Sequence, residues 1–221
     1  MDDKIIWDYL LGKIGNKFGV SALMGNLYVE SKLIPNFLEG SCARKLKMTS
    51  DEYTNAVDNG LYTNFVHDSC GYGLVQWTYW SRKEALLNFA KSRNASIGDL
   101  TMQLDYLWSE LQGYKKVISA VKDAKNIREA SDVITREYER PRTITEKTLQ
   151  TRAAYGQIFY DTLAAEYAKK VVATANVNIR VGNDKSYEKI GLLMKGKKLP
   201  FVAESENGWY AIKNGHQVSN R

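Results

Sequence analysis

Glu30 is the residue whose type and position best fit acid–base chemistry. The segment FGVSALMGNLYVESKL at residues 18–33 predicts a helix, because Leu23 and Leu27 recur at helical spacing. Glu30 falls on the same apolar stripe, three residues after Leu27, so its carboxyl group is expected to face the packed side. Burial and the negative C-terminal end of a helix both favour a protonated carboxyl group, which a general acid requires. Periodicity alone fits a solvated glutamate near a helix end equally well.

A second segment with chemical potential is GYGLVQWT at residues 71–78. Its two glycines and its alternating pattern predict a tight hairpin that lines a binding site. The segment carries an amide at Gln76 and aromatic rings at Tyr72 and Trp77. Either this segment or the helix with Glu30 is a weak signal by itself, so the interpretation depends on their occurrence together.

Three segments carry a family resemblance: GNLYVESKLIPNF at residues 25–37, GYGLVQWTYWSRKEAL at 71–86 and ITREYERP at 134–141. Together they resemble the phage tail lysozyme family, whose members are peptidoglycan muramidases related to goose-type lysozymes and lytic transglycosylases. The resemblance covers roughly the first three quarters of the chain. It implies a phage endolysin that cleaves the β-1,4 bond between N-acetylmuramic acid and N-acetylglucosamine without a cofactor. Glu139 and Arg140, in the third segment, are interpreted as structural residues near a helix end.

Cleavage of a glycosidic bond needs a proton for the departing oxygen and a way to stabilise positive charge at the anomeric carbon. Glu30 is expected to supply the proton as general acid. The second need can be met by a carboxylate that activates water, by a nucleophilic carboxylate, or by the acetamido group of the substrate. Asp68 is the preferred carboxylate because it flanks the 71–78 segment. Asp58 is the alternative, although its sequence context also fits a turn.

The 71–78 segment is expected to bind the sugar. Gln76 matches the binding glutamine of the family, and its amide can both donate to and accept from an acetamido group. Tyr72 and Trp77 offer flat apolar faces for pyranose rings. Alternate residues of a strand face opposite ways, so Trp77 also fits the core. Thr78 can position a water molecule, or it can simply fit the pleat of a strand.

The two cysteines, Cys42 and Cys70, form neither a disulfide framework nor a zinc site, because a structural zinc ion needs four ligands. No metal is therefore expected. His67 lies close to Cys70 in the sequence, but catalytic thiol dyads usually take their histidine from a distant segment. Two free thiols, or one bridge beside the cleft, are the favoured alternatives.

The charge balance favours a polyanionic partner. Lysine and arginine number 31 against 25 aspartate and glutamate, a net charge of +6. Anionic wall polymers on bacterial peptidoglycan fit this charge, whereas the chain has no nucleic-acid fingerprint and no basic run with interleaved aromatic residues. No apolar run approaches the roughly 20 residues of a membrane span, so stable membrane insertion is not expected. The start MDDK lacks a signal peptide, which predicts synthesis in the host cytoplasm, and the resemblance implies release by a holin-type pore.

Periodicity divides the chain into two domains of an α+β fold. Helical spacing recurs at residues 4–14, 81–92, 100–112, 114–123, 127–138 and 145–168. After Lys170 the pattern changes to alternating, β-branched residues, and residues 176–213 resemble the bacterial SH3-like module that many lysins use to hold the cell wall. We therefore expect a mostly helical, lysozyme-like domain over 1–168 and a small SH3-like β-barrel over 171–221.

Three alternatives stay open at this level. The last strand of the β-module is expected to be truncated, because the chain ends in NGHQVSNR where the module usually closes with a Gly-Trp-Val strand; the module then fits a structural appendage as well. A lytic transglycosylase would use the same Glu30 and Gln76, with an intramolecular hydroxyl group in place of water. A non-catalytic wall-binding protein would keep the β-module and tolerate loss of Glu30.

Overall fold

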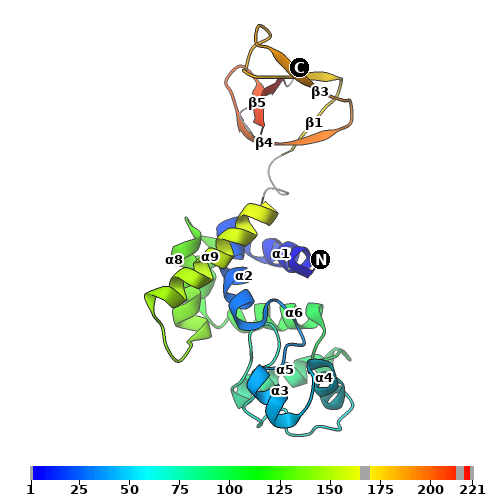
Figure 1. Ribbon diagram of the computed structural model, residues 1–221, viewed down its shortest axis with the longest axis vertical. Helices are drawn as coiled ribbons and strands as arrows, with labels where there is room; N and C mark the ends of the chain where they lie inside the picture. Colours follow the sequence, from blue (N-terminus) through cyan, green and yellow to red (C-terminus); the bar gives the residue numbers. More distant parts are fainter. Residues whose placement is uncertain (1, 165–169, 213–216, 220–221) are drawn as a thin grey trace. The chain divides into compact units, whose positions relative to one another are not determined.

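The computed structural model describes residues 2–164, 170–212 and 217–219. The chain divides into two compact units, residues 1–160 and 161–221. Helices form the first unit and the second consists mainly of strands, so the predicted α+β class is confirmed (Figure 1). Among the residues described, no helix is both long and apolar enough to cross a bilayer.

The helical unit follows the predicted periodicity closely. Its elements are α1 (Asp2–Ile14), α2 (Lys17–Ser31), α3 (Gly40–Leu46), α4 (Ser50–Asp58), α5 (Trp80–Ser92), α6 (Leu100–Leu111), α7 (Lys115–Lys122), α8 (Ile127–Ile134), the π-helix η1 (Thr135–Glu139) and α9 (Glu146–Leu163). The helix predicted over 127–138 is therefore α8 followed directly by a wider π-turn. Residues 165–168, the end of the last predicted helix, lie outside the described part of the chain.

Helix α2 is the central helix of this unit, with α1, α8 and α9 around it (Figure 1). Every residue from Gly19 to Leu27 is buried. Two glycines let neighbouring helices touch its backbone: a Cβ at Gly19 would lie 1.9 Å from the Val121 carbonyl oxygen, and one at Gly25 would lie 2.4 Å from that of Arg152. The helix ends where Lys32 adopts a left-handed conformation (φ 58°), so Glu30 lies in its last turn.

The 71–78 segment forms a tight turn with a single antiparallel bridge. Tyr72 and Trp77 exchange two backbone hydrogen bonds of 3.2 and 2.9 Å, and the backbone amide of Gln76 donates to the Gly73 carbonyl. Gly73 and Gln76 both have positive φ, 79° and 53°. The predicted hairpin is thus present as a turn, and its other side pairs with Leu38.

The second unit is an antiparallel sheet in the order β1-β4-β5-β6-β2-β3. Its strands are β1 (Lys170–Val172), β2 (Val177–Arg180), β3 (Lys189–Leu193), β4 (Lys198–Glu204), β5 (Trp209–Ile212) and β6 (Gln217–Ser219). The alternating run from Val171 to Arg180 is therefore divided between β1 and β2. Strand β6 is short, but it pairs with both β5 and β2. Leu193, Trp209 and Val218 are buried in this unit.

Candidate active site

A surface pocket of about 500 Å³ in the helical unit gathers segments that are far apart in the sequence. Three carboxyl groups line it, from the end of α2, from the residue before α3 and from the end of η1: Glu30, Glu39 and Glu139. Gln76 and Thr78 of the tight turn also line it. The structure therefore brings Glu30 and Gln76 together, as the sequence predicted, and adds two carboxyl groups that it did not.

Glu30 faces the pocket and is paired with a buried arginine. Its Oε1 accepts a hydrogen bond from the guanidinium group of Arg152, and the Arg152 side chain is only 3% exposed. The same guanidinium group also contacts Asn26 one turn earlier on α2. The contact with this buried guanidinium group fixes the orientation of the Glu30 carboxyl group in the pocket. Arg152 could not be predicted as a partner of Glu30, because it lies 122 residues away in the chain, on α9.

Glu139 lines the same pocket in a different electrostatic environment. Its Oε1 is buried and has no hydrogen-bond partner among the described residues. Burial, and then the negative charge of Glu30, raise the pKa of Glu139 to about 8, while Arg152 and Arg82 act in the opposite direction. Glu139 therefore holds a proton at neutral pH. The structural role expected of it is incomplete, because the side chain faces the pocket; Arg140 ends the π-helix with φ 47° at the surface.

The position of Glu139 is fixed by a buried network around Glu110. Arg82 binds the Glu110 carboxylate through two hydrogen bonds of 2.7 and 2.8 Å. Tyr138 donates to the same carboxylate at 2.5 Å, and Trp77 donates to it at 3.1 Å. Because Tyr138 precedes Glu139 in η1, this network anchors the π-helix to α5 and α6.

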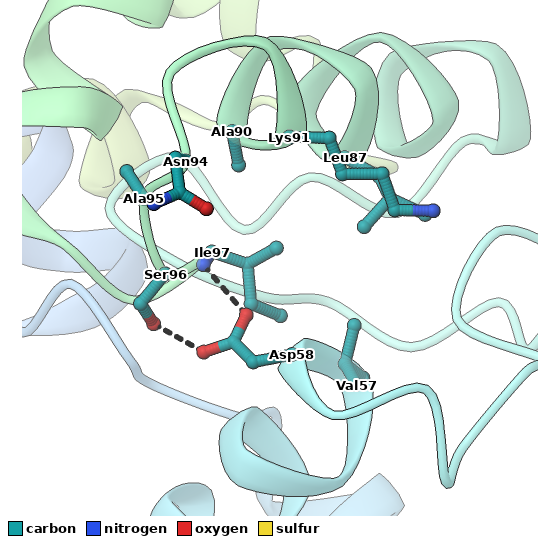
Figure 2. A pocket seen from close by; sticks show the side chains of 9 residues that line it. All are labelled: Val57, Asp58, Leu87, Ala90, Lys91, Asn94, Ala95, Ser96 and Ile97. Atoms are coloured by element: carbon teal, nitrogen blue, oxygen red, sulfur yellow. Dashed lines mark hydrogen bonds between the residues drawn. The ribbon is translucent and has the colours of Figure 1, made fainter.

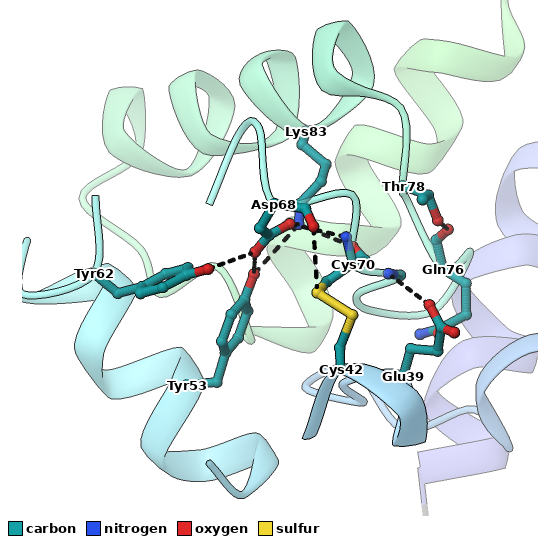
Figure 3. A network of polar contacts seen from close by, with 10 residues as sticks. Glu39, Cys42, Tyr53, Tyr62, Asp68, Cys70, Gln76, Thr78 and Lys83 are labelled. Atoms are coloured by element: carbon teal, nitrogen blue, oxygen red, sulfur yellow. Dashed lines mark hydrogen bonds and ion pairs between the residues drawn. A yellow bond between two sulfur atoms is a disulfide. The ribbon is translucent and has the colours of Figure 1, made fainter. Parts of the chain in front are cut away.

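Glu39 and Gln76 face each other across Gly71 (Figure 3). The Glu39 carboxylate accepts hydrogen bonds from Ser41 Oγ at 2.5 Å and from the Gly71 amide at 3.3 Å. Gln76 Nε2 donates to the carbonyl groups of Phe37 and Gly73. A Cβ at Gly71 would lie 2.7 Å from Gln76 Oε1, so only glycine leaves room for this amide.

A disulfide bond joins the two segments that carry these groups. Cys42 in α3 is bonded to Cys70, which directly precedes Gly71 (Figure 3). Of the two alternatives left open by the sequence, the single bridge beside the cleft is present. Because both sulfur atoms are bonded, a thiol dyad of Cys70 with His67 is excluded in this state.

Comparison with models of protein families shows which family the helical unit resembles. The family model for phage tail lysozyme matches residues 2–163. The chain belongs to the phage tail lysozyme family. Comparison with curated proteins gives no match. The match covers the whole helical unit and all pocket residues, and it indicates a lysozyme-like peptidoglycan hydrolase with peptidoglycan as its substrate.

In this lysozyme domain Asp68, which was expected to assist catalysis, lies in a buried polar network outside the pocket of Glu30 (Figure 3). Its side chain is 3% exposed and forms an ion pair of 2.5 Å with Lys83, which is fully buried. Tyr53 donates to the same carboxylate at 2.5 Å, and the Cys70 amide donates at 2.9 Å. Burial lowers the pKa of Lys83, and the charge of Asp68 opposes this effect. The carboxylate is thus occupied by the lysozyme domain itself and does not line the pocket of Glu30.

The alternative carboxylate, Asp58, belongs to a different pocket (Figure 2). It ends α4 and accepts hydrogen bonds from Ser96 Oγ at 2.5 Å and from the Ile97 amide at 2.9 Å. Figure 2 shows the carboxylate directed at this turn. Asp58 therefore fixes the connection between α5 and α6, in agreement with its interpretation as a turn residue.

The aromatic residues of the tight turn, Tyr72 and Trp77, lie in the core and do not line the pocket, although they were expected to stack on sugar rings. Both side chains are fully buried. The Tyr72 hydroxyl group pairs with Thr54, and the Trp77 indole donates to Glu110. Phe37 and Tyr79 are the aromatic residues that line the pocket, and Tyr79 is 62% exposed. Thr78 is exposed in the pocket, and its hydroxyl group donates to the Gln76 carbonyl.

The described ranges contain no group of three or more histidine, cysteine, aspartate or glutamate side chains arranged to hold a metal ion. The carboxyl, amide and guanidinium groups that line the pocket can perform proton transfer and charge stabilisation. Glu39, Glu139 and Tyr79 are the pocket residues that the sequence reasoning missed or misread. The only available signal was their place inside the three resembling segments or directly beside them.

We expect Asp68→Asn to destabilise the protein rather than to remove a catalytic group. Loss of one partner leaves the Lys83 ammonium group buried without compensation, which typically costs about 3–5 kcal/mol of unfolding free energy. Urea denaturation measures this loss. Assayed well below its melting temperature, the variant keeps most of its activity.

The matched control is Asp8→Asn, which breaks an exposed ion pair with Lys4 (side chains 47% and 50% exposed). Exposed pairs contribute little to stability. If both variants unfold at the same urea concentration, the buried pair does not have the structural role assigned to it.

Proposed function

We propose that this chain is an endolysin-type lysozyme that hydrolyses the β-1,4 bond between N-acetylmuramic acid and N-acetylglucosamine. The observation that carries the proposal is the convergence of three carboxyl groups and the Gln76 amide on one pocket. Glycoside hydrolysis needs a proton donor and a carboxylate to manage water or positive charge, and this pocket supplies both kinds of group. A non-catalytic wall-binding protein would need neither.

Glu30 is the central acid of the proposed reaction. In its protonated form it donates to the departing glycosidic oxygen. Arg152 then stabilises the carboxylate that remains, since its guanidinium group is already within hydrogen-bonding distance. The end of α2 and the buried arginine therefore hold the reacting oxygen atoms of Glu30 in place before substrate binds.

Glu39 takes the place that the sequence assigned to Asp68. Two hydrogen bonds, from Ser41 and from the Gly71 amide, orient its carboxyl group. Such a carboxylate can activate a water molecule for attack at the anomeric carbon. Beside it, Gln76 Oε1 can accept from the N–H of an acetamido group, and Tyr79 offers an exposed ring for a sugar face.

A lytic transglycosylase remains the alternative, because it needs the same acid and the same binding glutamine. The oriented Glu39 favours hydrolysis, since a transglycosylase uses an intramolecular hydroxyl group and needs no activated water.

Reaction products separate these possibilities. We expect digested peptidoglycan to carry reducing N-acetylmuramic acid ends, measured by mass spectrometry. Products with 1,6-anhydro ends would instead identify a transglycosylase, and reducing N-acetylglucosamine ends would show that a different glycosidic bond is cut. The two chain ends differ in mass by one water molecule, so a single digest distinguishes hydrolysis from transglycosylation.

Glu30→Gln is expected to leave a folded protein with little activity. The amide has the shape of the carboxyl group but cannot deliver a proton, so clearing of cell-wall suspensions should slow by about a hundredfold or more. Thermal unfolding checks that loss of the Arg152 pair has not unfolded the domain. Glu84→Gln, at an exposed position of α5, is the control and should clear walls at the parental rate. A Glu30→Gln rate within about tenfold of the parent would show that the acid is another residue.

We further propose that the strand-rich unit is an SH3-like module that concentrates the enzyme on the wall after release from the host cytoplasm. Strand β3 and the residue after it present three exposed apolar side chains, Ile190, Leu192 and Met194, at alternating positions. Exposed lysines at positions 195, 197 and 198 follow directly. An exposed apolar patch with positive charges beside it fits a glycan surface that carries anionic polymers.

A chain that ends at Lys170 should still cut soluble glycan fragments at near the parental rate but sediment less with intact walls. Leu192→Asn with Met194→Gln in the full chain is the finer test, because it changes only the exposed face. It should weaken wall sedimentation while thermal unfolding of the helical unit stays unchanged. Equal sedimentation of the parent, the shortened chain and the double variant would leave the unit without a binding role.

A further inference from the structure

Glu139 combines a fixed backbone with an unsatisfied carboxyl oxygen. The preceding Tyr138 is tied to Glu110 at 2.5 Å, and the π-helix ends directly after Glu139. Glu139 Oε1 is nevertheless buried without a partner in the part of the chain described here. An unpaired buried acceptor is destabilising, and more so when it is charged. π-turns of this kind are frequent at functional sites. The fixed backbone therefore holds the side chain in the pocket, and the unpaired buried oxygen favours the neutral form of its carboxyl group.

Four charged groups from four helices face Glu139: Glu30 on α2, Arg82 on α5, Glu110 on α6 and Arg152 on α9. The two arginines are already engaged, because Arg82 binds Glu110 through two hydrogen bonds and Arg152 binds Glu30. Two carboxyl groups that share one site do not both ionise easily. Since the arginine contact belongs to Glu30, the negative charge stays on Glu30 and the proton on Glu139.

We propose that Glu139 is a second catalytic carboxyl group, and that Glu139 and Glu30 act as a pair that shares one proton, which Glu139 holds in the resting enzyme. The proposal rests on the glycosidase function proposed above and changes the account of where its proton comes from. In catalytic pairs, different environments let one carboxyl group act as the acid while the other stays ionised. The environments of Glu139 and Glu30 differ in this way.

The proton balance of the cycle closes within the pair and the substrate. As the bond between the anomeric carbon and the leaving oxygen breaks, the pair transfers its proton to that oxygen, and both carboxyl groups are then ionised. Arg152 and Arg82, the two cations that face the pair, limit the cost of this state. Water attacks the anomeric carbon, forms the new carbon–oxygen bond and releases one proton, which returns to the pair. No other reactant is needed.

Glu139→Gln tests the proposal kinetically. We expect kcat/KM on peptidoglycan to fall by about a hundredfold or more at neutral pH, as for loss of a general acid. The double variant Glu30→Gln, Glu139→Gln should be no slower than the slower single variant, because residues that act as one unit are not additive. In the parent, kcat/KM should fall as the pH rises through about 8, and the residual activity of Glu139→Gln should lack this fall.

The matched control is Glu137→Gln. Glu137 lies in the same π-helix, but it pairs with Lys116 at the surface and does not line the pocket. Parental kinetics are expected for this variant. Kinetics of Glu139→Gln within about tenfold of the parent, or strictly additive losses in the double variant, would overturn the proposal.

A second measurement needs neither substrate nor a substituted Glu139. In protein with ¹³C-labelled glutamate, the Glu139 carboxyl resonance should titrate near pH 8, and its midpoint should fall in Glu30→Gln because the charge of Glu30 raises it. An ordinary glutamate midpoint, or one that Glu30→Gln leaves unchanged, would show that no proton is shared. If the parent does not cleave peptidoglycan, the proposed function fails, whereas this titration still decides whether the pair exists.

Discussion

The active pocket depends on the direct backbone contact between α2 and α9. A Cβ on Gly25 would lie 2.5 Å from the Gly156 nitrogen, and a Cβ on Gly156 would lie 2.9 Å from the Ser21 carbonyl oxygen. Any larger residue at either glycine would push the helices apart. At this separation Arg152, one turn before Gly156, reaches both Asn26 and Glu30. The charge state of Glu30, and through it the proton on Glu139, therefore follows from how closely two helices pack.

The sequence predicted the residues whose signal is local. Glu30 could be predicted as a candidate site residue because it interrupts an apolar stripe, and Gln76 because it follows a glycine turn. The buried ion pair of Asp68 could not be predicted in this way. Its partner Lys83 lies on α5, and no residue near Asp68 in the sequence indicates a buried cation. Tyr72 and Trp77 show a different limit. Alternation predicts opposite faces, but both faces of this turn are covered, by Tyr53 and Phe65 on one side and by Tyr106 on the other, so neither ring reaches solvent.

Glu139 escaped the sequence reasoning for a geometric reason. Periodicity predicts one helix over 127–138, but the chain widens from α8 into the π-helix η1 at Thr135. A wider turn changes the direction in which each following side chain points, so helical spacing no longer indicates the buried face. The β-unit illustrates a milder form of the same limit, because the predicted alternating run is interrupted between Val172 and Val177. In both places the residue types predicted the class of element, but they did not indicate where the backbone geometry changes.

The buried carboxyl groups of this protein differ mainly in how many donors surround them. Glu110 accepts from Arg82, Tyr138 and Trp77. Burial raises its pKa, but the hydrogen bonds from these three donors and the charge of Arg82 together outweigh burial, and the net pKa is lowered. Glu139 is just as enclosed by these same helices but receives none of those donors. Because the Arg82 guanidinium group is committed to Glu110 in two hydrogen bonds, it donates none to Glu139, and the negative charge of Glu110 opposes its effect on the pKa of Glu139. Glu110, which accepts hydrogen bonds from three side chains, stabilises the fold. Because the same network occupies Arg82, it also leaves Glu139 able to carry a proton.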